Sequence, residues 1–261
     1  MKKVVLAYSG GLDTSYCVKY LTKELGLEVY AITVNTGGFT VKEIEEIERK
    51  AKLLGVKDYK VQDVTKAYYE QCIKYLIFGN VLKNNTYPLS VSAERVFQAM
   101  AVAEYAKSID ADYVAHGSTG AGNDQVRFDM IFNIIVPEAK IITPIRDQKL
   151  SRDAEIEYLK AEGVEIDAAK AQYSINQGIW GTSVGGIETL NSRDTLPEKA
   201  YPSQLEKEGF QKLVLTFNKG ELVAVNGKID KSEKCIELLN NLASKYAIGR
   251  DIHVGDTIVG T

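Results

Sequence analysis

The sequence is poor in the residues that build metal centres and disulfide frameworks. Its 261 residues include three cysteines, Cys17, Cys72 and Cys235, and two histidines, His116 and His253. Three widely spaced cysteines without a C-x-x-C pair argue against a disulfide framework and a structural zinc site, and they indicate a reducing compartment. Two histidines are too few for a His-based metal cluster. We therefore expect no metal ion held by protein side chains.

The chain also lacks a basic excess and long apolar runs. Lys and Arg number 32 against 35 Asp and Glu, a net charge of −3, whereas a dedicated nucleic-acid-binding protein is basic. No apolar run approaches the roughly 20 residues that span a bilayer. A strand pattern begins at Val4, which leaves no room for a secretory signal peptide. These features predict a cytoplasmic protein that binds neither nucleic acid nor membranes.

The sequence contains enough apolar residues for a large hydrophobic core, since 45% of its residues are hydrophobic. Short β-branched runs alternate with amphipathic helical patterns as far as about residue 165. This alternation predicts a doubly wound α/β domain, in which helices cover both faces of a parallel sheet. The expected strands are Val4–Ala7, Glu28–Val34, Asp58–Val61, Tyr113–His116 and Lys140–Pro144. The expected helices are 13–25, 41–54, 96–106 and 152–161, the last with Ser151 as its N-cap.

The alternation of strand and helix patterns ends in the second part of the chain. Residues 174–201 are rich in Gly, Ser, Asn and Thr and predict a long, partly irregular connection. A hairpin is expected around 218–220. Asp230 and Glu233 form a capping-box-like start to a final helix. We therefore expect a domain over 1–166 and a smaller α+β domain over 167–261.

A glycine-rich loop follows the first expected strand and precedes the first expected helix. Gly10 and Gly11 stand there among the hydroxyl residues Ser9, Thr14 and Ser15. Backbone N–H groups and the positive end of a helix dipole meet at such a loop, which favours phosphate binding. The loop is neither a Walker A motif nor a G-x-G-x-x-G dinucleotide motif. An ordinary strand-to-helix turn is the alternative.

A second glycine-rich segment, 117–128, follows the expected strand that ends at His116. Its place at the carboxyl end of a strand indicates the crevice at a topological switch point. Arg127 offers a planar fork for a carboxylate, and Asp124 can accept hydrogen bonds from an ammonium group. Together with Asn123 and Thr119 they suit a zwitterionic amino acid. The alternative is a surface loop in which Arg127 is solvated.

Both loops resemble those of a known family. Residues 7–15, A-Y-S-G-G-L-D-T-S, are similar to the pyrophosphate loop of the N-type ATP pyrophosphatases, most closely that of the argininosuccinate synthases. Residues 117–128 follow the pattern G-x-T-G-x-G-N-D-Q-V-R-F of that family. Segments 86–92 and 173–183 resemble further parts of it, and the resemblance covers essentially the whole chain. It implies a HUP-like ATP-binding domain followed by a synthetase domain.

The resemblance also implies roles for individual residues. The implied ATP contacts are Ala7, Tyr8, Ser9, Gly10, Gly11, Leu12, Asp13, Thr14, Ser15, Val34 and Gly117. The implied citrulline contacts are Tyr87, Ser92, Asn123, Arg127, Ser174 and Ser183. The implied aspartate contacts are Thr119, Asn123 and Asp124. No catalytic acid or base is implied, and His116 is interpreted as a packed structural residue. Simple burial at a strand end is an equal alternative for Val34.

The implied activity is a ligase reaction that forms a C–N bond. ATP, as its Mg²⁺ complex, adenylates citrulline and releases pyrophosphate; aspartate then displaces AMP, which yields argininosuccinate. Members of the family act in arginine biosynthesis and the urea cycle and assemble as homotetramers, so a homo-oligomer is expected here.

Some positions depart from the family pattern. Ala121 stands where a lysine is common, and Gly255 aligns with a glutamate that contacts citrulline. A citrulline-contacting tyrosine and a C-terminal helix would lie beyond Thr261, so we expect a member that lacks the family's last third. The alternatives are a catalytically impaired member that binds only ATP, or another ATP-pyrophosphatase ligase.

Overall fold

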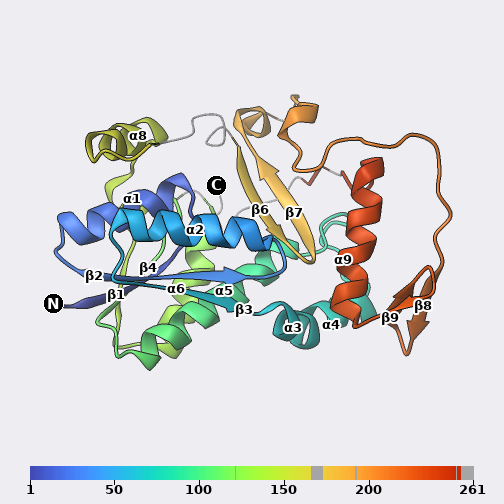
Figure 1. Ribbon diagram of the computed structural model, residues 1–261, viewed down its shortest axis with the longest axis horizontal. Helices are drawn as coiled ribbons and strands as arrows, with labels where there is room; N and C mark the ends of the chain where they lie inside the picture. The colour runs from blue at the N-terminus through green and yellow to red at the C-terminus, as the bar shows by residue number, and fades with distance from the viewer. Residues whose placement is uncertain (121, 166–172, 192, 251, 254–261) are drawn as a thin grey trace. The chain divides into compact units, whose positions relative to one another are not determined.

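The computed structural model (Figure 1) describes residues 1–120, 122–165, 173–191, 193–250 and 252–253. These residues group into two compact units, one formed by 1–64 with 92–165 and the other by 65–91 with 173–253. The expected domain boundary at 166/167 lies outside the described residues and stays a prediction. Ala121, Gly255 and the expected strand at 256–260 also lie outside them.

The first unit contains the parallel sheet that the sequence predicts. Its five strands lie in the order β3-β2-β1-β4-β5, and every neighbouring pair is parallel. The strands are β1 (Lys3–Ala7), β2 (Glu28–Asn35), β3 (Asp58–Asp63), β4 (Tyr113–Ala115) and β5 (Lys140–Ile142). All five expected strands are therefore confirmed, with ends shifted by one or two residues.

Six helices accompany these strands in the described residues. They are α1 (Leu12–Lys23), α2 (Val41–Leu54), α5 (Ser90–Ser108), α6 (Asp124–Ile135), α7 (Pro144–Gln148) and α8 (Arg152–Ala161). Two of them begin with side-chain caps. The Thr40 hydroxyl and the Glu43 carboxylate form a capping box on α2, and Ser151 Oγ accepts a hydrogen bond of 3.3 Å from the Ala154 N–H. The second observation confirms Ser151 as the N-cap of α8.

The core of this unit lies in two layers, one on each face of the sheet. Successive side chains of a strand point to opposite faces, so Val4 and Leu6 enter one layer and Val5 enters the other. Residues of α1, α2 and α8 complete the first layer, and residues of α5 and α6 complete the second. Figure 1 shows α1 and α2 lying along one face of the strands. A parallel sheet covered on both faces is the doubly wound arrangement that the sequence predicts.

Strand β1 lies at the centre of the sheet, and this position creates the switch point. The chain runs from β1 to β2 and β3 on one side and later to β4 and β5 on the other. The connections that leave the carboxyl ends of β1 and β4 therefore diverge, which opens a crevice between them. Both glycine-rich loops of the sequence analysis begin at these two strand ends.

The second unit consists of short elements. An α-helical turn, α3 (Thr65–Tyr68), continues through a π-helical turn (Tyr69–Ile73) into α4 (Lys74–Phe78). The strands are β6 (Ser174–Gly178) and β7 (Gly181–Gly185) in one hairpin and β8 (Leu215–Asn218), β9 (Glu221–Val225) and β10 (Lys228–Ile229) in another sheet. The helix α9 (Ser232–Ala243) packs on β9, and 3₁₀ turns occur at 187–190, 198–200 and 244–246. Among the described residues, no helix is long and apolar enough to cross a membrane.

Two expectations for this unit need correction. The segment that begins at Ser174, expected to be partly irregular, is more regular at its start: it forms the antiparallel β6–β7 hairpin, whose largely polar strands show no apolar alternation. The predicted capping box before the last helix is also wrong. The N-cap of α9 is Lys231, without a side-chain cap, because the Asp230 carboxylate accepts the Lys231 N–H at 2.8 Å instead. The expected β8–β9 hairpin is confirmed.

Candidate nucleotide and amino-acid site

The first glycine-rich loop needs its glycine at position 10. Gly10 has φ of +75°, and a Cβ atom there would lie 3.0 Å from Cγ1 of Ile47 on α2. A larger residue would therefore be both strained and crowded. Gly11 is the N-cap of α1 and has no side chain with which to cap it. The N-terminus of α1 thus presents its backbone to the crevice as a helix end suited to a phosphate.

Side chains hold this loop in shape. Ser15 Oγ donates to the Gly11 carbonyl at 2.6 Å, and Thr14 Oγ1 lies 3.3 Å from Ser9 Oγ. From α2, Lys50 Nζ donates to the Gly10 carbonyl at 2.7 Å. The lysine therefore fixes the loop and brings a positive charge to it, which favours an anion nearby. The amphipathic pattern of α2 predicted its apolar face but not this contact.

The second glycine-rich loop meets the first at Gly117. A Cβ atom at Gly117 would lie 3.3 Å from both Asp13 Cβ and Thr14 Cγ2. Only a residue without a side chain fits there without displacing the first turn of α1. Val34, at the end of β2, is buried. The predicted ATP residues thus lie in the first unit around the carboxyl ends of β1, β2 and β4.

A buried network supports the start of the second loop. His116 is 1% exposed, its Nε2 lies 2.9 Å from Asp129 Oδ1, and its Nδ1 accepts from the Ser118 N–H at 3.2 Å. Because Nδ1 accepts, the proton of the neutral ring is on Nε2 and is donated to Asp129. Arg146 Nη1 contacts the other Asp129 oxygen at 2.6 Å. This agrees with the interpretation of His116 as a structural residue.

The same network reaches the turn of the loop through Gln125. Arg146 Nη1 donates to Gln125 Oε1 at 3.0 Å, and Gln125 Nε2 donates to the carbonyls of Gly120 and Gly122. Burial alone would raise the pKa of Asp129, but hydrogen bonds from His116 and Arg146 outweigh it and lower the pKa. The carboxylate therefore stays ionised and anchors both partners.

Charged side chains gather where the second loop enters α6. The Asp124 carboxylate lies between two guanidinium groups, with Arg95 Nε at 2.9 Å and Arg127 Nη1 at 2.9 Å. Glu94, 2% exposed, accepts from Gln98 at 2.8 Å and contacts Arg95, and its burial raises its pKa. The predicted amino-acid residues Asp124 and Arg127 are thus paired with each other. A guanidinium has five N–H donors, so Arg127, which uses Nη1 for Asp124, retains donors for a carboxylate.

The remaining predicted citrulline residues are divided between the two units. Ser92 lies in the first turn of α5 in the first unit. Tyr87 belongs to the second unit, where its ring stacks on His253 with centroids 4.7 Å apart. Ser174 and Ser183 lie on the same face of the β6–β7 hairpin, since Ser174 is opposite Gly185 and side chains alternate along a strand. Trp180 Nε1 at the turn of this hairpin donates to the Pro88 carbonyl at 2.8 Å, which links it to the Tyr87 segment.

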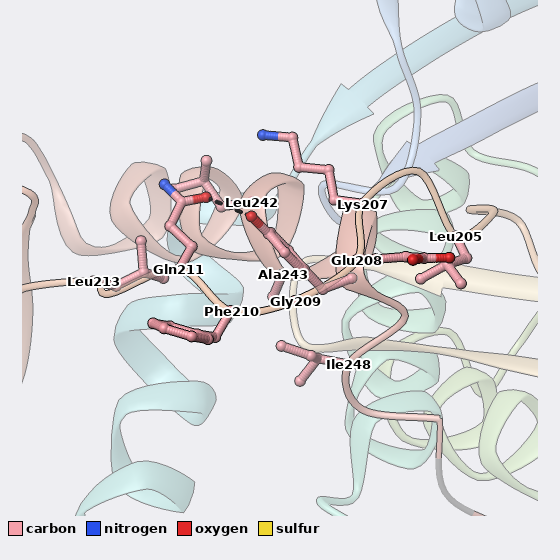
Figure 2. Close-up of a pocket in the computed structure, with 11 residues that line it drawn as sticks. Leu205, Lys207, Glu208, Gly209, Phe210, Gln211, Leu213, Leu242, Ala243 and Ile248 are labelled. Atoms are coloured by element: carbon pink, nitrogen blue, oxygen red, sulfur yellow. Dashed lines mark hydrogen bonds between the residues drawn. The ribbon is translucent and has the colours of Figure 1, made fainter.

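Figure 2 shows a separate pocket in the second unit, between the segment that contains Phe210 and the end of α9. Its volume is about 450 Å³, and its walls are largely apolar. Tyr246 donates a hydrogen bond of 3.0 Å to Gln211 across one wall. None of the predicted site residues lines it. Within the described ranges, no group of three or more His, Cys, Asp and Glu side chains is arranged to hold a metal ion.

The parallel sheet, its switch point and the two glycine-rich loops define a nucleotide-binding α/β protein. Residues 3–165 match the family described as "Arginosuccinate synthase N-terminal HUP domain". The chain therefore belongs to the argininosuccinate synthase family.

Curated relatives agree with this assignment. The chain is 38% identical to the argininosuccinate synthase of Sulfurisphaera tokodaii, over 99% of this chain and 66% of the relative. It is 39% identical to that of Sulfolobus acidocaldarius, with the same coverage. It is 39% identical to that of Methanocaldococcus jannaschii, over 98% of this chain and 65% of the relative. The chain thus spans slightly less than two thirds of the length of these proteins.

Proposed function

We propose that this chain carries the argininosuccinate synthase reaction, the ATP-dependent ligation of citrulline and aspartate into argininosuccinate with release of AMP and pyrophosphate. The proposal makes it a ligase of arginine biosynthesis. The names of its relatives support it, and the contact of the two glycine-rich loops is the observation that carries it. The proposed ATP residues are 7–15, Val34 and Gly117.

The first loop is the proposed cradle for the phosphates of ATP. It combines the N-terminus of α1, the hydroxyls of Ser9, Thr14 and Ser15, and the ammonium of Lys50. These groups are donors or positive dipoles, which stabilise the charge that develops on departing pyrophosphate. We propose that Mg²⁺ enters with ATP as part of the substrate and is held mainly through phosphate oxygens and water.

The second loop is the proposed receptor for the amino-acid groups. Thr119, Asn123 and Asp124 are proposed for aspartate. Arg127 is proposed for citrulline, because its guanidinium retains donors that suit a carboxylate. Asn123, Tyr87, Ser92, Ser174 and Ser183 are the further proposed citrulline residues.

The proposed chemistry proceeds in two displacements. The ureido oxygen of citrulline attacks the α-phosphorus of ATP and expels pyrophosphate, which leaves a citrullyl-adenylate. The amine of aspartate then attacks the ureido carbon and forms the new C–N bond, the C–O bond breaks as AMP departs with the former ureido oxygen, and the aspartate nitrogen loses a proton. Neither step needs a strong protein acid or base, so orientation of three charged substrates supplies most of the acceleration. This suits loops rich in Gly, Ser, Thr, Asn and Arg.

The test is pyrophosphate release from MgATP, with citrulline and aspartate added singly and together. Citrulline-dependent release, with argininosuccinate formed only when aspartate is present, is the expected result. ATP binding without citrulline-dependent turnover would favour a member that binds only ATP. Release that depends on a different co-substrate would favour another ATP-pyrophosphatase ligase. A cytoplasmic homotetramer belongs to the same proposal, and sedimentation of the purified chain tests its oligomeric part.

A further inference from the structure

The first turn of α1 faces a buried carboxyl group on α8. The two helices pack against each other, and Asp13 and Glu155 both lie in first turns. Glu155 is only 2% exposed, and its carboxyl group is within hydrogen-bonding reach of that of Asp13. Its Oε2 atom is buried and has no hydrogen-bond donor among the described residues. Glu155 is not among the residues assigned to substrate contacts above.

Two ionised carboxylates cannot satisfy each other, because both are acceptors only. A buried oxygen without a donor costs free energy, so such a contact persists when one of the two groups carries a proton. The more buried group is the one that retains it. Burial, first, and the neighbouring Asp13 carboxylate, second, together raise the pKa of Glu155 to about 8.

The other groups near Glu155 do not offset its burial strongly enough to keep its carboxyl group ionised. From α1, besides Asp13, it faces the phenol of Tyr16 and the fully buried thiol of Cys17. Burial raises the pKa of both, so they are neutral. On its own helix, Arg152 acts in the opposite direction and lowers the pKa of Glu155, but less than burial and Asp13 raise it.

We propose that Glu155 is a positioning residue that holds the Asp13 side chain in the phosphate loop through a proton shared between the two carboxyl groups. The second glycine-rich loop passes close to Asp13, since a Cβ atom at Gly117 would lie only 3.3 Å from Asp13 Cβ. Asp13 is thus fixed both by the second glycine-rich loop and by α8. The role in ATP binding rests on the proposed function, whereas the shared proton does not depend on it.

The shared proton has a consequence for an anionic ligand. With it, the pair carries one negative charge beside the phosphate loop; without it, the pair carries two. The second charge would repel ATP phosphates and would also push the two carboxylates apart. MgATP affinity should therefore decrease as the pH rises through about 8, the pKa of Glu155.

The first experiment is a ¹³C NMR titration of side-chain carboxyl groups in the unliganded full chain. The Glu155 signal is assigned by its loss in Glu155→Gln, and Glu157→Gln serves as the matched control because Glu157 is exposed on the same helix. The expected result is one glutamate that titrates near pH 8 and is absent only from E155Q. Titration of Glu155 together with the exposed glutamates would overturn the shared proton.

The second experiment is equilibrium binding of MgATP across the same pH range. Wild-type and E157Q proteins should bind about fivefold more weakly on the alkaline side. E155Q, whose amide donates to Asp13 at every pH, should keep the tighter affinity throughout. Glu155→Met, similar in length but without a donor, should bind weakly at every pH. Circular dichroism verifies that each variant is folded before its affinity is compared.

Two outcomes separate this inference from the proposed function. If the wild type binds MgATP but E155Q shows the same pH dependence, Glu155 is not the positioning residue, while the proposed function stands. If no variant binds MgATP, the proposed function fails together with the role of the pair in binding. In that case the NMR titration alone decides whether the carboxyl groups share a proton.

Discussion

The backbone of Gly117 approaches Asp13 so closely that a Cβ atom at Gly117 would lie 3.3 Å from that of Asp13, although the two residues are more than 100 positions apart in the chain. This contact joins the loop after β4 to the first turn of α1. It places the two glycine-rich loops at one point of the crevice, next to the central strand of the sheet. The two loops therefore form parts of one site, and the residues that hold them in place can be tested by substitution.

Replacement of Gly117 should weaken ATP binding by displacing Asp13 and Thr14. We expect Gly117→Val to reduce MgATP affinity by about tenfold or more, and Gly117→Ala to have a smaller effect, because the crowding starts at the Cβ atom. Isothermal titration calorimetry measures the affinity. Gly122→Ala is the control in the same loop, since its Cβ atom would meet its nearest neighbour only at 4.0 Å. Equal effects of G117V and G122A would contradict the proposed contact.

Loss of the Lys50 ammonium should loosen the first loop and remove its positive charge. Lys50→Met should weaken MgATP binding by about threefold to tenfold, a range that corresponds to one charge-assisted hydrogen bond. Lys52→Met on the same helix is the matched control, because the ammonium of Lys52 pairs with Glu48 at the surface. The affinity of both variants can be measured with a fluorescent ATP analogue. A K50M protein with wild-type affinity would show that the lysine has no part in binding the nucleotide.

The proposed roles of the two loops predict a selective effect of Arg127. Arg127→Ala should lower citrulline affinity by about tenfold or more and leave MgATP affinity within about twofold, because its guanidinium lies beside Asp124 in the second loop. Pyrophosphate release as a function of citrulline concentration measures the first effect, and MgATP calorimetry measures the second. Asn133→Ala, an exposed position farther along α6, is the control. Equal loss of both affinities would count against the assignment of Arg127.

The Asp129 network predicts a pH-dependent contribution to stability. Because hydrogen bonds lower the pKa of Asp129 below its ordinary value of 3.8, its stabilising effect is present above that value and lost as the pH falls through the folded-state pKa. Asp129→Asn should reduce the free energy of unfolding by about 2 kcal/mol near neutral pH, with a decreasing difference from the wild type in acid. Urea unfolding at neutral and acidic pH tests this.

The control for that experiment is Asp153→Asn, which removes an exposed carboxylate from the first turn of α8. It should change the free energy of unfolding by well under 1 kcal/mol at either pH. A constant difference between D129N and the wild type at all pH values would show that Asp129 contributes by packing and not through its charge.

Much of the first unit could be predicted because its signals are local. The β-branched run at Val4–Ala7 and the apolar spacing over 41–54 each fall within a few turns of chain, and both elements form as expected. The β6–β7 hairpin was missed for the opposite reason, since its polar strands bury few apolar side chains and therefore have no period to detect. The incorrect prediction of Asp230 as a helix cap shows that a short motif does not decide from which N–H group a side chain accepts its hydrogen bond.

The residues that hold the two glycine-rich loops of the candidate site in place were harder to predict. Lys50, Glu94, Asp129, Arg146 and Glu155 all lie in helices of the structure, where a polar residue ordinarily faces solvent, and only Lys50 and Glu155 lie in helices that the sequence predicted. The available signal was a polar residue at a position that the helical period places on a buried face, as for Glu155, which precedes the buried Leu159 by four positions. Such a position indicates a buried polar group but not its partner.

By itself, the sequence determined the five strands of the parallel sheet, the positions of α1, α2, α5 and α8, where glycine-rich turns lie, and which family the motifs resemble. These properties depend on side-chain periodicity and on residues close together in the chain. Only the tertiary structure decided that β1 lies between β2 and β4, that Gly117 meets Asp13, and that Glu155 faces Asp13. Such contacts join residues that are tens to more than a hundred positions apart. They are set by how whole elements pack, because burial of both faces of the sheet dictates which polar side chains must find partners inside.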